Sequence, residues 1–189
     1  MLAQSGIACR RNRNMGLGMR AVWMMIAAWM LAVPATAPAD EIEDLAVARA
    51  AYLEAWRAAP LHAVNATFVT REAAHFGDAA PRGSTLFAED EAILIYLELR
   101  GYDFRPVRGG VEFGVAIDLE LTNDDGRTIF ERKNFQVSQL QAQEEVFSLF
   151  SSVRLKLGGL TGPHTAKLII RDIVSDQQTE VPLLFEIDG

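Results

Sequence analysis

The chain has little of the chemistry on which most enzymes and metal proteins depend. Its 189 residues include one cysteine, Cys9, and three histidines, and all six methionines lie within the first 30 positions. From residue 31 onward there is neither thiol nor thioether. This excludes a disulfide, a cysteine nucleophile and a sulfur-based copper or zinc site in that part of the chain.

The remaining side chains form no recognisable catalytic or metal-binding motif. His62, His75 and His164 lie in three separate segments, without the close spacing of histidine metal ligands. No G-x-S-x-G motif and no lysine-containing glycine loop for phosphate occur. We therefore expect no metal, no cofactor and no enzymatic activity. Surface acids leave a calcium site open as an alternative.

The first 39 residues have the composition of a secretory signal peptide. Four arginines and no acid precede or border an apolar run at 21–33, which is shorter than the roughly 20 residues that span a bilayer. Small residues follow at Ala37 and Ala39, so we predict cleavage after Ala39. Translation from Met15 or Met19 would preserve the same pattern. This order predicts a periplasmic or secreted protein.

Cleavage would leave a strongly acidic chain. Residues 40–189 contain 14 lysines and arginines against 25 aspartates and glutamates, a net charge of −11. Such a charge repels phosphate backbones and anionic lipid surfaces, so we expect no nucleic-acid partner. No membrane span is expected after cleavage. The 150 remaining residues suit one domain with a core of its own.

A short helix is predicted first, over 40–60. The segment is rich in alanine and leucine, has acids in its first turn and stops at Pro60. Leu45, Tyr52 and Trp56 fall near one face. We expect this thin apolar stripe to lie against the rest of the domain.

After Pro60 the hydrophobic period changes from that of a helix to that of a strand. About seven alternating segments are predicted as strands, at 64–71, 91–101, 111–123, 127–135, 146–157, 164–174 and 180–187. Asp125-Gly126 suits a hairpin turn. Pro182 requires either that its strand lies at a sheet edge or that its N–H position points to solvent. Residues 138–145 are polar and suit a loop or a helical turn. The pattern predicts an all-β fold, an antiparallel two-sheet sandwich.

The last third of the chain resembles the C-terminal strands of bacterial secreted immunoglobulin-like domains. Those strands often read G-x-Y-x-L-x-V-x-V-x-D, followed by a turn and a last strand with an aromatic residue. The matching positions are Gly162, Leu168, Ile170, Asp172 and Phe185. The segments "EAILIYLEL" and "DLELTNDDGRTIF" look like the middle strands. The resemblance covers about 64–188 and implies an immunoglobulin-like β-sandwich over 61–189, with no particular activity.

Two positions of the predicted strand 164–174 have a local structural explanation. His164 stands where the related pattern has tyrosine, and alternation places it inward. We expect its ring to pack at the start of the strand while a ring nitrogen bonds nearby backbone. Asp172 is expected to accept backbone N–H bonds where the strand leaves the sheet.

The loop at 100–110 is the candidate partner-binding site. It combines Tyr102, Phe104, Arg105 and Arg108, and aromatic and arginine side chains are typical anchors of protein interfaces. In the alternative interpretation, which we prefer, the two aromatic rings fold back to cap the core and the arginines pair with nearby acids.

The sequence thus favours an exported, non-catalytic module. We expect it to bind another cell-envelope protein through a loop end or a strand edge. A periplasmic domain that binds a small ligand, a sugar or calcium is the alternative.

Overall fold

The computed structural model describes residues 39–189, so the predicted leader lies outside the described residues except for Ala39. Residues Glu43–Gly189 form one compact unit. Its elements are α1 (Ala39–Ala58), β1 (His62–Val69), β2 (Leu86–Phe87), β3 (Ile93–Arg100), β4 (Arg105–Val107), β5 (Gly110–Asn123), β6 (Thr128–Ala142), β7 (Leu149–Leu155), β8 (Gly162–Asp172) and β9 (Gln178–Ile187).

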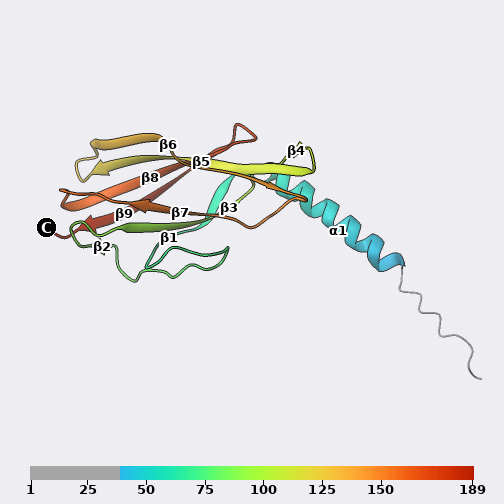
Figure 1. Ribbon diagram of the computed structural model, residues 1–189, viewed down its shortest axis with the longest axis horizontal. Helices are drawn as coiled ribbons and strands as arrows, with labels where there is room; N and C mark the ends of the chain where they lie inside the picture. The colour runs from blue at the N-terminus through green and yellow to red at the C-terminus, as the bar shows by residue number, and fades with distance from the viewer. Residues whose placement is uncertain (1–38) are drawn as a thin grey trace, which may run out of the picture. The chain divides into compact units, whose positions relative to one another are not determined.

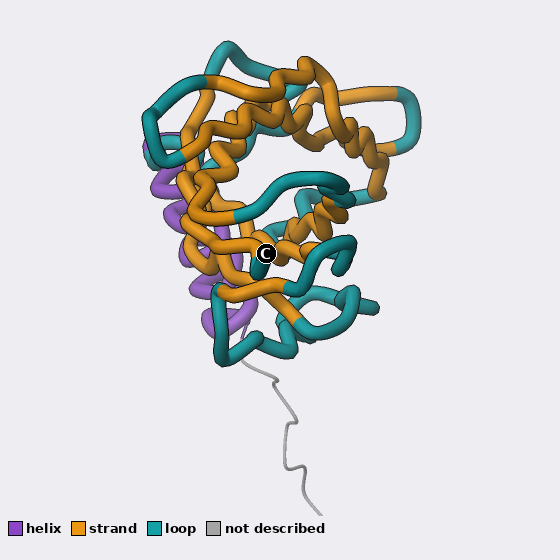
Figure 2. Tube along the Cα trace, turned by 90° about the vertical axis from the view of Figure 1, so that its left-hand side faces the viewer, coloured by secondary structure: helices purple, strands orange, loops and turns teal. Residues whose placement is uncertain are grey.

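The strands form two sheets, and this confirms the all-β prediction (Figure 1). The smaller sheet has the order β1-β3-β7. In the larger sheet, β5 pairs with β8 and β4 along one edge and with β6 along the other, and β9 and β2 continue beyond β8. All neighbours are antiparallel except the short pair β2 and β9. The larger sheet follows an arc when viewed along its strands (Figure 2).

The core forms where the inner faces of the two sheets meet. Alternate residues of β5 from Phe113 to Leu121 are buried, as are Ile93, Ile95, Leu97 and Leu99 of β3. Strand β3 is buried on its other face too, because the segment after β1 crosses it. There the Tyr96 hydroxyl accepts the Gly77 N–H (2.8 Å) and donates to the Glu98 carboxylate (2.9 Å).

The seven predicted strands are all present, with boundaries that differ by a few residues. The main difference is in the polar stretch 138–145, whose first five residues extend β6 instead of forming a loop or helical turn. Pairing with β5 continues to Val111–Ala142, so the neighbouring strand determines the conformation here. Strands β2 and β4 are too short to leave an alternating pattern.

Two local predictions about turns and edges are confirmed. Gly126 has a φ of 73° and donates its N–H to the Asn123 carbonyl oxygen (3.0 Å), which closes the β5–β6 hairpin. Pro182 pairs with Lys167 of β8 on one side. On its other side β9 pairs with β2 only at Glu186 and Ile187, so the missing N–H of the proline faces a free edge.

The predicted helix is present, but its apolar stripe docks only in part. Trp56 is buried, and its indole N–H donates to the Tyr102 carbonyl oxygen (2.8 Å). Tyr52 packs edge-on against Phe147 with ring centroids 4.9 Å apart. Leu45, in contrast, is 71% exposed, so the expectation that it lies against the domain is wrong. Only the C-terminal turns of α1 reach the aromatic cluster.

Candidate functional site

The two sheets have different widths, and this leaves one side of the core uncovered. The smaller sheet ends at β7, whereas the larger sheet continues past β5 to β6. Phe130 pairs with Leu121 and Leu140 pairs with Phe113. Directly paired residues point to the same face, so both side chains belong to the inner face of the sheet. Nevertheless, Phe130 is 42% exposed and Leu140 is 43% exposed.

A hollow of about 290 Å³ lies at this uncovered side, which we call the β6–β7 cleft. It is lined by Leu119, Leu121, Ile129, Phe130, Phe135, Leu155, Lys156, Leu157, Gly158 and Leu160. Both sheets and the loop after β7 contribute to the lining. The lining residues are apolar except for one lysine. Such a surface suits an aliphatic or aromatic group rather than a polar substrate.

Strand β7, beside the cleft, has a free edge. Among the described strands it pairs only with β3, from Leu149 to Leu155. Its other edge therefore carries backbone N–H and C=O groups that no strand of the described chain satisfies. Such an edge is a template for pairing with another extended chain.

One side-chain contact crosses the opening. The Gln136 amide on β6 donates to the Ser151 hydroxyl on β7 (2.9 Å). Ser151 is buried and is the one polar residue on the inward face of β7. The hydrogen bond explains this break in the apolar pattern, because a buried hydroxyl is stable only with a partner.

The charged side chain that lines the β6–β7 cleft is a cation, while the carboxylate of Asp90 lies outside the lining, 3.2 Å from where a Cβ on the lining residue Gly158 would stand. None of its lining residues is acidic, and one is Lys156. Arg132 pairs with Leu119 and so shares the inner face of β6, where its guanidinium lies over the Phe135 ring at 5.7 Å. Within residues 41–189, neither Lys156 nor Arg132 has an acidic partner within ion-pair distance.

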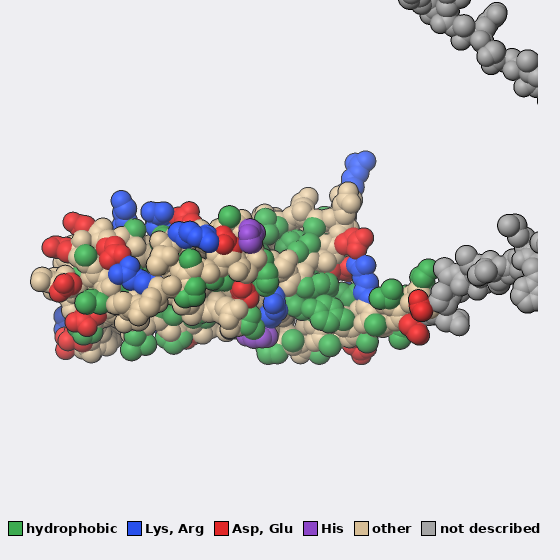
Figure 3. Space-filling view, turned by 90° about the horizontal axis from the view of Figure 1, so that it is seen from below, with side chains coloured by type: hydrophobic (Ala, Val, Ile, Leu, Met, Phe, Trp, Pro, Cys, Tyr) green, Lys and Arg blue, Asp and Glu red, His purple; other side chains and the backbone are tan. Residues whose placement is uncertain are grey.

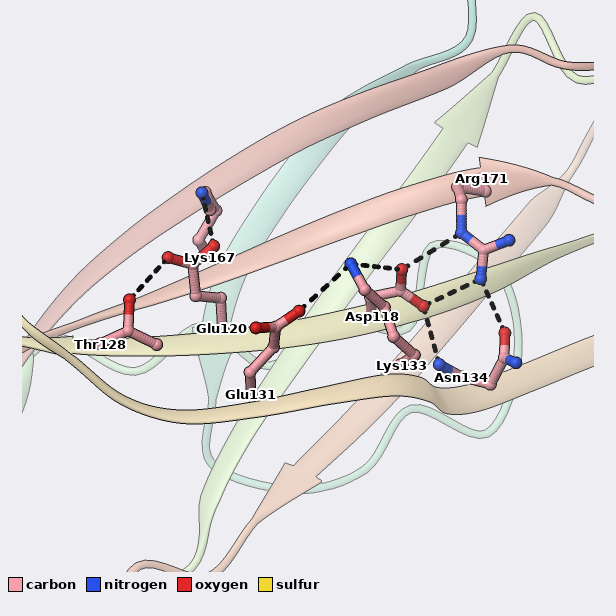
Figure 4. Close-up of polar contacts among 8 residues, drawn as sticks. All are labelled: Asp118, Glu120, Thr128, Glu131, Lys133, Asn134, Lys167 and Arg171. Carbon is pink, nitrogen blue, oxygen red and sulfur yellow. Dashed lines mark hydrogen bonds and ion pairs between the residues drawn. The ribbon is translucent and has the colours of Figure 1, made fainter.

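On the outer face of the same sheet, by contrast, Lys133, Lys167 and Arg171 pair with acidic side chains (Figure 4). Asp118 on β5 is buried, accepts two hydrogen bonds from Arg171 (2.9 and 3.2 Å) and lies 3.6 Å from Lys133. It also accepts the N–H of Asn134 (2.7 Å), which has a φ of 50° at an irregularity in the β5–β6 pairing. Asp118 therefore fixes a bulge in β6.

The pKa of Asp118 reflects two opposing effects. Burial raises the pKa, but the hydrogen bonds from Arg171 and Asn134 together with nearby positive charges outweigh burial. The net result is a pKa below the usual value for aspartate. The carboxylate thus stays ionised, as a structural anion that holds β5, β6 and β8 together.

The loop proposed from sequence as an interface places its residues in different environments. Tyr102 is 0% exposed, and its hydroxyl donates to the Val146 carbonyl oxygen. Phe104 is partly buried against the same core, 5.4 Å from the Tyr102 ring. Arg105 pairs with Glu112 of β5, and Arg108 is exposed in the turn after β4. The rings thus cap the core, as the alternative interpretation describes, while a partner-binding role for this loop stays a prediction.

Hydrophobic side chains also gather on the molecular surface at this end, where α1 meets the sheets (Figure 3). The aromatic cluster beneath includes Trp56, whose ring lies 5.1 Å from Tyr102 and 4.7 Å from Phe147. These rings pack mainly against one another. This end therefore resembles a closed core with an exposed border, unlike the hollow between β6 and β7.

His164 and Asp172 occupy the positions predicted for them. His164 is buried, stacks on Phe185 with centroids 5.7 Å apart, and its Nδ1–H donates to the Gly162 carbonyl oxygen (2.9 Å). Asp172 accepts the N–H groups of Asp103 (2.7 Å) and Val174 (2.8 Å). Both side chains have structural partners. In the described part of the chain, no group of three His, Cys, Asp or Glu residues could hold a metal ion.

The residues of the β6–β7 cleft were not identified from the sequence. Phe130 and Phe135 fall in the predicted strand 127–135, but a bulge at Asn134 interrupts the alternation that would assign their faces. The available signal was the presence of aromatic residues at odd and even positions of one strand. Strict alternation would place these two rings on opposite faces, whereas in the structure both line the same cleft.

No family model matches the chain, and no curated protein matches it. Over residues 39–189, none of the helices combines the length and apolar character needed to cross a membrane.

Proposed function

We propose that this chain is an exported, non-catalytic interaction module. It binds an extended segment of another cell-envelope protein, which adds to the free edge of β7 and covers the β6–β7 cleft. The observation that carries the proposal is the unequal width of the sheets. A free strand edge and an uncovered apolar face adjoin at the same place, and one added strand would satisfy both.

We further propose an immunoglobulin-like arrangement of the strands. In the smaller sheet, β1, β3 and β7 would correspond to strands A, B and E of such domains. In the larger sheet, β5, β8 and β9 would correspond to strands C, F and G. Strand β6 takes the place of C′, beside C. The place of strand D, beside E, has no strand in the described chain. His164, at the start of β8, takes the place of the tyrosine near the start of strand F.

The vacant D position supports binding by strand addition. A segment paired with β7 would run opposite the inner face of β6, where Phe130 and Leu140 are exposed. Main-chain hydrogen bonds to β7 would supply affinity independent of sequence. Alternate side chains of the added strand would enter the cleft and supply specificity.

The test is site-specific cross-linking in an envelope extract. A photoreactive side chain replaces Phe130 in one variant and Leu184 in a second, which is the control. Leu184 is 69% exposed and lies on β9, outside the cleft lining. We expect one dominant cross-linked protein from position 130 that is absent from position 184. Its cross-linked segment is then mapped and synthesised as a peptide.

The peptide decides the outcome. We expect Phe130→Ser to weaken peptide binding at least tenfold, because it removes an apolar wall of the cleft, while Leu184→Ser leaves binding unchanged. Equal weakening by both variants would contradict the proposal. A small molecule as the dominant adduct at position 130 would contradict it as well.

A further inference from the structure

We infer that the bound segment carries a bulky apolar side chain with an acidic residue next to it, so that the apolar group fills the β6–β7 cleft and the carboxylate meets Lys156 and Arg132. This inference rests on the proposed function and specifies the chemistry of its partner. It comes from three observations: the size of the cleft, the charge of its lining, and the contrast with the outer face of the same sheet.

The size of the cleft suits a single anchor. Its volume of about 290 Å³ lies at the lower limit of pockets that enclose drug-sized ligands, which begin near 300 Å³. Leu119, Leu121 and Leu155 form its floor from both sheets. One aromatic or long aliphatic side chain, projecting from a strand along β7, would fill such a space.

The cations beside the cleft form no ion pair within the described chain, although the Arg132 guanidinium lies over the Phe135 ring. On the outer face, Lys133 lies 3.3 Å from Glu131, and Lys167 lies 2.6 Å from Glu120 (Figure 4). Arg154, on β7, lies 2.8 Å from Glu72. Lys156 and Arg132 share the lack of an acidic partner with Arg57, Arg100, Arg108 and Arg127 of the described chain. Of these six cations, Lys156 lines the cleft and Arg132 lies over the ring of Phe135, which also lines it. Their charges remain available to a carboxylate from outside the domain.

The charge balance of the chain also predicts how this recognition behaves. A net charge of −11 over residues 40–189 repels an acidic segment at long range. Long-range electrostatics therefore does not speed the association of such a segment with the chain. Selection must act after contact, through short-range pairing at the border of the cleft. Each exposed pair is expected to change affinity by about two- to fivefold. Salt should weaken this preference, because border charges are screened.

The experiment selects binders from a random peptide library displayed on phage, with the full chain immobilised. Peptides eluted from the chain are compared with those eluted from the Phe130→Ser variant, and those lost with the variant define the cleft-dependent set. We expect this set to show an aromatic or long aliphatic residue with aspartate or glutamate within two positions of it.

Charge reversal then tests the assignment directly. Lys156→Glu should weaken cleft-dependent peptides about five- to tenfold and shift a repeated selection toward lysine and arginine. Arg57→Glu is the matched control, because Arg57 is an exposed arginine in the last turn of α1, outside the cleft lining. It should change neither the affinity nor the selected sequences.

The two proposals fail differently in this experiment. Cleft-dependent peptides without acidic enrichment, or an equal response to Lys156→Glu and Arg57→Glu, would overturn the inference and leave the proposed function standing. A selection that yields no cleft-dependent peptide would overturn both.

Discussion

Gln136, in the middle of β6, donates a hydrogen bond of 2.9 Å from its side-chain amide to the hydroxyl of Ser151 on β7. These two strands are the last of their sheets on the same side of the core. The contact therefore joins two free edges that no backbone ladder connects.

The first prediction concerns this bridge. Ser151→Ala should lower the free energy of unfolding by about 1 kcal/mol, because the amide of Gln136 loses its partner. Gln136→Leu should cost a similar amount, since it leaves the buried hydroxyl unpaired. The double variant Gln136→Leu with Ser151→Ala should cost less than the sum of the two. Urea denaturation of the four proteins measures the coupling, and strict additivity would contradict a direct interaction.

The second prediction concerns acid stability. The folded-state pKa of Asp118 is lowered relative to the unfolded value of about 3.9. Its contribution is therefore fully present above the unfolded pKa and is lost as the pH falls through the folded pKa. We expect Asp118→Asn to cost about 1–3 kcal/mol at pH 7 and much less at pH 2. Urea denaturation of both proteins across this range measures the difference, and an equal cost at both pH values would contradict it.

The third prediction concerns Gly114 in β5, whose φ is 149°. A Cβ placed there would overlap the carbonyl oxygen of Ser138 on β6. Gly114→Ala should therefore destabilise the fold by about 2 kcal/mol or more, because backbone on both strands must shift. Gly83→Ala is the control, since a Cβ at Gly83 meets no atom within 4 Å. Similar melting temperatures for the two variants would contradict the close approach.

The fourth prediction concerns His164. A tyrosine at this position keeps a ring to stack on Phe185 and a polar tip for nearby backbone, so His164→Tyr should change stability by less than about 1 kcal/mol. His164→Ala should cost about 2 kcal/mol or more, because it leaves a cavity beside Phe185. Thermal denaturation checks both values. A loss of partner binding in a stable His164→Tyr protein would contradict a purely structural role.

Much of the fold could be predicted because period-two alternation is strong where one strand face is dry. Strand β5 shows this best, with six consecutive odd positions from Val111 to Leu121 that are apolar. Asp172 and Pro182 were also predictable, because their roles depend on local backbone chemistry. In each case the cause lies within a few residues of the position.

The candidate site could not be predicted because its causes are distant in sequence. The cleft exists because β7 ends one sheet and β6 extends the other, and pairing partners are not encoded in the alternation of either strand. The polar stretch from Ser138 becomes strand only because β5 is long enough to pair with it. Similarly, the exposure of Leu45 depends on how far the sheets reach along α1. Alternation indicates which face is apolar, but not whether a second sheet covers it.

The measurement that tests the account most directly is amide hydrogen exchange of β7 with and without the peptide derived from the cross-linked partner. Free, the amides of Leu149–Leu155 that do not bond to β3 should exchange readily, because no strand of the described chain pairs with that edge. Bound, they should become protected together with the amides of the peptide, while β9 near Leu184 is unchanged. Binding without added protection of β7 would contradict strand addition at this edge.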